Sequence, residues 1–198
     1  TCAFEVALAF WVALGRPSWW ITLLQVSMVA SFTAILALGE PRLLVSPFGM
    51  LTKNVPIVAA VVVAYLIERE GYSPRARWLL RGGMASVWIT EGLFPKILFQ
   101  QAEELSIATQ TGLAFGRPGT LLLVIGALQV TSGVAVLATR GPVLRWLLIA
   151  QAGGLIVLPV VVSWFVPWLW FHPFGPFTKN VPVLLGTLVI LRRCSSWS

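Results

Sequence analysis

Long apolar runs separated by short polar breaks dominate this chain. A run of about 20 apolar residues crosses a hydrocarbon layer about 30 Å thick as an α-helix. Glycine and proline pairs, as in Gly116-Arg117-Pro118 and Gly141-Pro142, mark turns between successive runs. Short links of this kind favour antiparallel packing of neighbouring helices. The pattern predicts seven membrane helices, at residues 1–14, 18–39, 53–67, 77–99, 119–139, 143–171 and 179–191.

One eleven-residue segment occurs twice. Residues 46–56 (SPFGMLTKNVP) and residues 172–182 (HPFGPFTKNVP) agree at eight of eleven positions, at an offset of 126. The same offset pairs Trp20 with Trp146, so the repeat extends backwards beyond the motif. We therefore predict two related units, in which residues 71–198 form a complete four-helix unit and residues 1–70 form three helices of a second. Because residue 1 corresponds to about residue 125, we expect roughly 50 further residues upstream.

The repeat also constrains the fold class. A unit with four helices returns the chain to its starting side of the membrane, so two such units share one orientation. The prediction is an all-α integral membrane bundle whose two units are related by an axis along the membrane normal. Both copies of the motif should then lie on the same face.

Composition supports the membrane assignment and narrows the function. Of the 198 residues, 58% are hydrophobic and 11% are charged, whereas soluble domains carry about a quarter charged residues. The net charge of +7 comes from basic residues scattered singly at the ends of apolar runs, which argues against nucleic-acid binding. Cys2 and Cys194 lie at opposite ends and His172 is the single histidine, which argues against a metal site or an internally ligated haem.

The distribution of positive charge predicts an orientation. Nine Lys and Arg residues fall on one predicted side of the membrane, and five fall on the side that carries the motifs. Loops rich in Lys and Arg stay on the cytoplasmic side of a membrane. We therefore expect the motif loops on the periplasmic face of a bacterial inner membrane.

All three lysines of the chain lie on the predicted motif side. Lys53 and Lys179 belong to the two motifs, and Lys96 ends the segment EGLFPK at residues 91–96. In one interpretation, a lysine at a helix start helps free backbone N–H groups to bind an anion or a polarised carbonyl such as a quinone oxygen. In the other, both motif lysines snorkel to the lipid headgroups while neighbouring Asn or Thr side chains cap short helices that have proline in the first turn.

Glu91 is a carboxylate inside an apolar run. Insertion scales put the cost of such a group at about 2.5–3.5 kcal/mol, so it is expected to face a partner or a cavity. It could exchange protons with, or hydrogen-bond to, a quinone head, or it could form a structural pair with Lys96 or Arg81. Gln129 and Gln151 are interpreted as hydrogen-bonding groups between packed helices. The candidate ligand site comprises Glu91, Lys96, His172, Lys179 and Asn180, with Lys53 and Asn54 as the equivalent group of the first unit.

The segment LLRGGMASVWITEGLFPKIL at residues 79–98, followed by Glu103-Glu104-Leu105, resembles the DoxX-like membrane family. Residues 172–176 and 178–180 resemble the last loop and helix of that family. The resemblance covers the second unit fully and the latter half of the first. It implies similarity to the DoxD and DoxA subunits, which are linked to archaeal quinol oxidation and to thiosulfate–quinone electron transfer. The family has no established catalytic residues to carry over.

Together these observations predict a subunit of a larger membrane redox or energy-converting complex, linked to quinone. No self-contained catalytic motif is recognisable, so any enzymatic role would be that of a quinone-interacting subunit of an oxidoreductase. The candidate ligands are a quinone or a lipid, and the expected partners are membrane lipids and other membrane subunits. Two alternatives remain open: a purely structural accessory subunit, and a small transporter suggested by the repeat alone.

Overall fold

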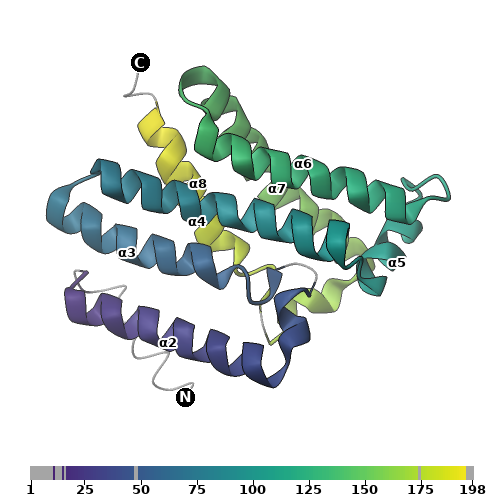
Figure 1. Cartoon of the computed structure of the whole chain (residues 1–198), viewed down its shortest axis with the longest axis horizontal. Helices are drawn as coiled ribbons and strands as arrows, with labels where there is room; N and C mark the ends of the chain where they lie inside the picture. The colour runs from purple at the N-terminus through teal and green to yellow at the C-terminus, as the bar shows by residue number, and fades with distance from the viewer. Residues whose placement is uncertain (1–10, 12–14, 16, 47–48, 174, 195–198) are drawn as a thin grey trace.

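The computed structural model describes residues 11, 15, 17–46, 49–173 and 175–194, and the described chain is all-helical. The predicted helix at residues 1–14 lies outside the described residues, apart from Trp11. The 3₁₀ turns η1 (Pro41–Leu44) and η4 (Pro167–Phe171) and the π-helical turn η3 (Leu93–Leu98) connect longer helices. The α-helices are α2 (Trp19–Gly39), α3 (Asn54–Glu70), α4 (Pro74–Gly92), α5 (Ala102–Gln110), α6 (Pro118–Ala138), α7 (Gly141–Phe165) and α8 (Asn180–Cys194) (Figure 1).

Within the described residues, three helices are long and apolar enough to cross a membrane: α2, α6 and α7. The prediction of an all-α membrane bundle is confirmed. Helix α8 has 15 residues and is therefore only about 22 Å long, less than the thickness of the hydrocarbon layer. The irregular loop before it must therefore pack against protein at that end of the bundle.

Local sequence explains where the helices begin and end. The Ser18 and Ser73 side chains accept hydrogen bonds from the first turns of α2 and α4, as N-caps do. Pro118 and Pro142 lie in the first turns of α6 and α7, where no backbone N–H is needed. The predicted helix at residues 143–171 was wrong at its C-terminal end, where the structure has the separate 3₁₀ turn η4. The α-helix stops at Phe165 because Pro167 follows, and proline disfavours the α conformation in the residue before it.

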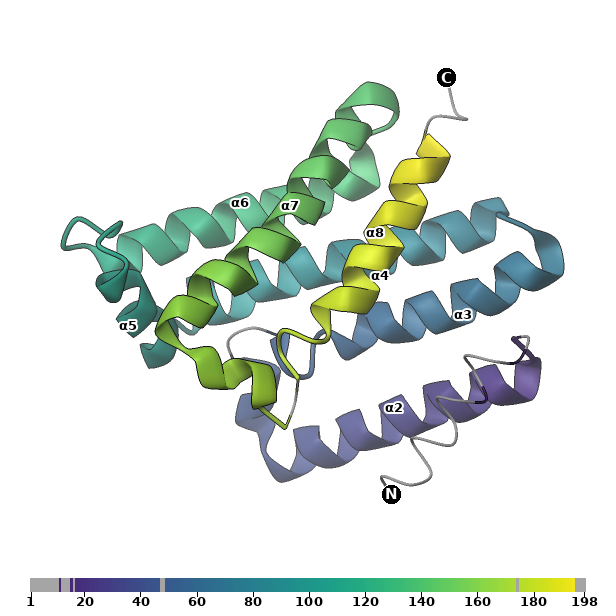
Figure 2. The ribbon, with the colours of Figure 1, turned by 180° about the vertical axis from the view of Figure 1, so that it is seen from behind.

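Helix α4 occupies the centre of the bundle. It lies between α3 and α6, while α7 and α8 cross it on the other face (Figure 2). The core between these helices is apolar, with Leu80, Met84, Val136, Leu148 and Val183 almost fully buried. Gly92 and Gly126 let α4 and α6 approach closely, since a Cβ atom on Gly92 would come within 2.5 Å of the Gly126 carbonyl oxygen.

Arg81 holds the end of α6 that lies far from the motif loops. Its side chain is 1% exposed, and its guanidinium donates hydrogen bonds to the carbonyl oxygens of Val136 at 3.0 Å and Thr139 at 2.8 Å. These carbonyls belong to the last turn of a helix, where backbone acceptors lack partners within the helix. Arg81, considered as one possible partner of Glu91, does not pair with it, because Glu91 is paired with Lys53.

The sequence repeat is also a structural repeat in the two motif loops. The Lys53 N–H donates to Gly49 O at 3.2 Å, and the equivalent Lys179 N–H donates to Gly175 O at 3.0 Å. Gly49 and Gly175 both adopt positive φ, at 66° and 55°, a conformation that favours glycine. Residues 49–55 and 175–181 thus share one backbone path.

Candidate functional site

The two motif loops meet at one end of the bundle, and the lysine of each loop donates a hydrogen bond to a backbone carbonyl of the other. Lys53 Nζ donates a hydrogen bond to Pro176 O at 2.9 Å, and Lys179 Nζ donates to Met50 O at 2.6 Å. The offset of 126 relates Lys53 to Lys179 and Met50 to Pro176. The two contacts are therefore the same interaction made once by each loop. Such reciprocity is what a two-fold relation between the loops produces.

These contacts contradict the snorkelling and capping interpretation at the first motif. Lys53 is 3% exposed and contacts backbone inside the bundle rather than reaching towards headgroups. No side chain caps α3, because the Asn54 amide instead donates to Thr33 Oγ1 at 2.8 Å and ties α3 to α2. Pro56 does lie in the first turn of α3, as predicted.

Two ion pairs lie beside this contact. Lys53 Nζ is 3.2 Å from Glu91 Oε1, and Lys96 Nζ is 2.8 Å from Glu104 Oε1. The predicted side-chain pair of Glu91 with Lys96 was wrong, because each of these residues has a different ionic partner. Lys96 nevertheless contacts Glu91 through the backbone, since its Nζ donates to Glu91 O at 3.2 Å.

The π-helical turn after α4 explains this backbone contact. Pro95 has no N–H, so it cannot donate to the carbonyl of Glu91 four residues earlier. That carbonyl is left without its helical partner, and the Lys96 ammonium takes the vacant acceptor. The turn also places Lys96 beside α5, where Glu104 is 5% exposed.

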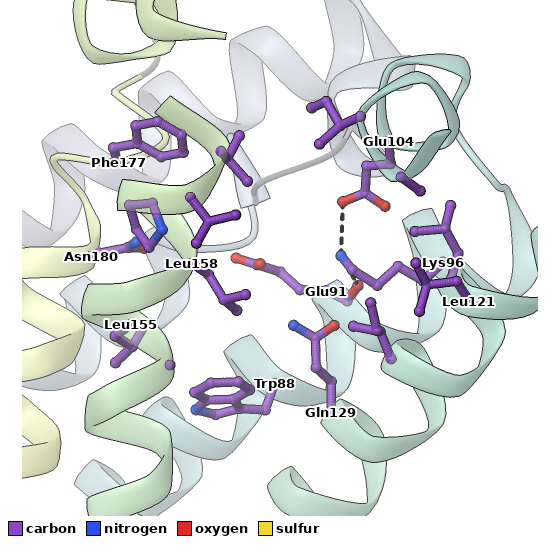
Figure 3. Close-up of a pocket in the computed structure, with 18 of the residues that line it drawn as sticks. Trp88, Glu91, Lys96, Glu104, Leu121, Gln129, Leu155, Leu158, Phe177 and Asn180 are labelled. Atoms are coloured by element: carbon purple, nitrogen blue, oxygen red, sulfur yellow. Dashed lines mark hydrogen bonds and ion pairs between the residues drawn. The ribbon is translucent and has the colours of Figure 1, made fainter. Parts of the chain in front are cut away.

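These charged residues lie at the polar end of a cavity of about 210 Å³. The cavity lies between α4, α5, α6 and α7, and Figure 3 shows Trp88 and Leu155 on one side of it and Glu104 on the other. Most of its wall is apolar. The polar and charged side chains of the lining are Lys53, Glu91, Lys96, Glu104, Thr111, Gln129 and Asn180.

Apart from Glu91 Oε1, which lies 3.2 Å from the Lys53 ammonium, four residues of the lining carry a buried polar atom that has no hydrogen-bond partner in the described part of the chain. These atoms are Trp88 Nε1, Glu104 Oε2, Gln129 Oε1 and Asn180 Oδ1. A buried polar group without a partner costs about 1–3 kcal/mol, so a cluster of four calls for a physical reason. Their convergence on one cavity indicates groups that a bound molecule would satisfy.

Comparison with known families decides the identity of the chain. The profile of the DoxX-like family matches residues 1–62 and 85–188. The chain belongs to the DoxX-like family. The two matched stretches end at residues 62 and 188, which the offset of 126 makes equivalent, so the match follows the repeat. Neither the curated proteins nor the solved structures contain a match to this DoxX-like chain.

Burial favours the neutral forms of several groups at the loop end of this DoxX-like protein. Desolvation lowers the pKa of Lys53, while the Glu91 carboxylate opposes the shift. Desolvation raises the pKa of Glu104, against the attraction of Lys96. Burial, together with the charge of Lys53, lowers the pKa of Lys179 to about 8.

Of the predicted site residues, four line the cavity: Lys53, Glu91, Lys96 and Asn180. Lys179 joins the two motif loops and Asn54 joins α3 to α2, and neither residue lines the cavity. His172 packs against Trp168 in a tilted arrangement, with ring centroids 5.1 Å apart, and is not part of the lining. Among the residues described, no group of three His, Cys, Asp or Glu side chains could hold a metal ion.

Sequence reasoning missed three residues of the cavity: Trp88, Glu104 and Gln129. Gln151 does join two helices as predicted, because its amide donates to Ser132 Oγ at 2.7 Å. Gln129 has the same sequence signal but lines the cavity instead. Glu104 follows residues 79–98, the segment that resembles the DoxX-like family. The short polar helix that carries Glu104 was nevertheless not predicted, because it has no long apolar run.

Proposed function

We propose that this DoxX-like protein is a membrane subunit that binds the polar head of a lipid-soluble molecule, and that this molecule is a quinone or quinol. The observation that carries the proposal is the set of four buried polar atoms without partners on an otherwise apolar cavity. Ligand sites in proteins combine mostly apolar walls with a few placed polar groups. The cavity is smaller than a typical site for a whole drug-sized ligand, and its size suits a ring-sized head.

Quinone chemistry fits the groups that line the cavity. A quinone ring presents two carbonyl oxygens on a flat apolar body, and these can accept a hydrogen bond from Trp88 Nε1. Its reduction adds two electrons and two protons. The resulting quinol has two hydroxyl groups, which can donate to unpartnered oxygens such as Glu104 Oε2 and Gln129 Oε1. Trp88 offers an aromatic face and a free N–H, while Glu104 and Lys96 form an ion pair in which burial favours neutralisation of the carboxyl group. Electrons would come from or go to a partner subunit. We propose that the protein belongs to a larger redox complex of a bacterial inner membrane, with the motif loops on the periplasmic side, where fewer positive charges lie.

The test is direct binding of a decyl-substituted benzoquinone, kept reduced as the quinol so that its hydroxyl groups can donate hydrogen bonds, to the protein in lipid nanodiscs. Replacing Glu104 by Gln should weaken binding about tenfold or more, because a hydrogen bond that involves a charged group contributes about 1.5–3 kcal/mol and tenfold corresponds to about 1.4 kcal/mol. The dissociation constant is measured by displacement of a radiolabelled quinone.

Glu103→Gln is the matched control, because it removes the same charge from the adjacent exposed position of α5. Gln129→Leu removes another unpartnered atom without changing charge, and it should also weaken binding. Thermal unfolding of each variant identifies any loss of fold. Absence of saturable quinone binding to the folded wild-type protein would refute the proposal, as would equal affinity of the Glu103 and Glu104 variants.

One observation favours a second candidate, a structural accessory subunit. Only 6% of the apolar stretch of helix α2 is buried. Large side chains lie at its surface, including Trp20, Ile35 and Leu38. Lipid or a partner helix can cover such a face equally well. If the Glu104 and Gln129 variants leave electron transfer unchanged in the native membrane while substitutions on α2 abolish assembly, the accessory function is the correct one.

A further inference from the structure

Among the described residues, the most exposed part of the cavity lining is apolar. The charged and amide groups of the lining are mostly enclosed: Lys53, Lys96, Glu104, Gln129 and Asn180 are all less than 10% exposed, and the Glu91 side chain is 13% exposed. Thr111 is half-buried. The lining residues that are well exposed are Leu113, Leu158 and Val161, at 63%, 46% and 43%. We call these three residues the mouth. A molecule that arrives through the mouth meets hydrocarbon side chains first and polar groups last.

The mouth lies on a helix that is long and apolar enough to cross the membrane. Leu158 and Val161 belong to α7, and Leu113 belongs to the loop between α5 and α6. Leu158 is seven residues from the end of α7 at Phe165, so it lies about 10 Å inside that end along the helix axis. Its exposed neighbours Val157 and Val160 are also apolar, as expected of a surface that faces lipid. The mouth therefore opens towards the side of the bundle, at the depth of the acyl chains.

The charges inside the cavity balance. Lys53 is paired with Glu91, and Lys96 is paired with Glu104. A ligand that carries a net charge would add an unpaired ion to an enclosed site, which is costly in a medium of low dielectric constant. An uncharged head adds no such cost and can still bond to the polar atoms that lack partners.

From the mouth and the charge balance we infer that the cavity is loaded sideways from the bilayer, and that its ligand is a single-tailed amphiphile with an uncharged polar head. The head contacts the buried groups around Glu104 and Gln129, and the tail leaves between Leu113 and α7 into the lipid. This inference rests on the proposed ligand site, but it does not require that the head be a quinone.

Narrowing the mouth tests the route. Val161→Trp places a large side chain in the mouth. The control is Val160→Trp, which places the same side chain on the preceding residue of α7; Val160 is 62% exposed and does not line the cavity. In nanodiscs, loading of the decyl-substituted benzoquinone should be at least about tenfold slower in the Val161 variant, and unchanged in the Val160 variant. Equal loading rates in the two folded variants would overturn lateral entry.

A second measurement locates the tail and does not depend on quinone chemistry. A dodecyl phenol with a diazirine in its chain should label peptides that contain Leu113, Leu158 or Val161. Labelling confined to other surfaces would overturn the inference. Lauric acid, which is anionic near neutral pH, should compete at least about tenfold less well than dodecanol, and equal competition would overturn the requirement for an uncharged head.

The two proposals fail in different ways. If dodecyl phenol labels the mouth and the quinone does not bind, the quinone assignment is wrong and the lateral route stands. If the quinone binds but loads equally fast in both tryptophan variants, the proposed function stands and the route is wrong.

Discussion

At the scale of single residues, backbone carbonyls hold the buried cations of this protein as much as carboxylates do. Lys53 donates to Pro176 O, Lys96 donates to Glu91 O, and Arg81 donates to the last carbonyls of α6. The sequence could identify the costly ions, because a charge inside an apolar run is visible as such. It could not identify these acceptors, since every residue has a carbonyl and only the fold decides which one lacks a partner.

The two motif lysines allow a matched comparison. Lys53→Met leaves both the buried Glu91 carboxylate and the Pro176 carbonyl without their lysine partner. The free energy of unfolding should therefore fall by about 3–5 kcal/mol. Among the described contacts, Lys179→Met removes the partner of the Met50 carbonyl only, and the expected fall in the free energy of unfolding is about 1–3 kcal/mol. Unfolding by SDS in mixed micelles measures both values, and equal losses would contradict the asymmetry of the two lysines.

At the scale of elements, the apolar runs predicted most helices to within a few residues. Helix α2 was predicted at 18–39 and lies at Trp19–Gly39, and α6 was predicted at 119–139 and lies at Pro118–Ala138. Two elements were not predicted. Helix α5 has nine residues with two adjacent glutamates, so no long apolar run marks it. The π-helical turn at Leu93–Leu98 leaves the Glu91 carbonyl to the Lys96 ammonium, and the pattern of apolar residues does not reveal such a contact between a side chain and the backbone. For this reason Glu104 was missed as the partner of Lys96.

The packing of α4 against α3 can be tested with two adjacent glycines. A Cβ atom on Gly83 would lie 2.4 Å from the Cβ atom of Ala59, whereas a Cβ atom on Gly82 would have no neighbour within 4 Å. Gly83→Ala should therefore lower the free energy of unfolding by about 1–3 kcal/mol. Gly82→Ala should leave it unchanged or raise it by about 0.5–1 kcal/mol, because alanine restricts the unfolded chain. Thermal unfolding in detergent checks the pair, and a larger loss for Gly82→Ala would refute the close contact.

At the scale of the whole molecule, the motif loops, the ion pairs and the polar end of the cavity gather at one end of the bundle. The turn between α3 and α4 and the turn between α6 and α7 lie at the other end. That both motifs share one end was predicted from the four-helix repeat, and the reciprocal lysine contacts confirm it. The boundary between the two units at residues 70 and 71 stays a prediction, as does the side of the membrane on which each end lies.

Cysteine labelling can determine that side. In a background where Cys2 and Cys194 are replaced by Ser, Thr178→Cys marks the motif end and Glu70→Cys marks the opposite end, and both positions are exposed. A membrane-impermeant maleimide should modify the Thr178 variant in intact bacterial cells with a permeable outer membrane. It should modify the Glu70 variant only after the inner membrane is broken, because the positive charges cluster at that end. The reverse pattern would invert the predicted orientation.

The reciprocal lysine contacts between the motif loops have a consequence for chains that carry a single copy of the motif. Here each loop supplies the ammonium for the other loop and receives one in return, so neither loop is satisfied alone. A chain with one such loop would leave both a buried ammonium and a buried carbonyl without partners. It could regain both contacts by pairing with a second copy of itself about a two-fold axis, since in such an interface every contact occurs twice. The tandem chain then has the interface of a homodimer within one polypeptide, where assembly no longer depends on the concentration of subunits in the membrane.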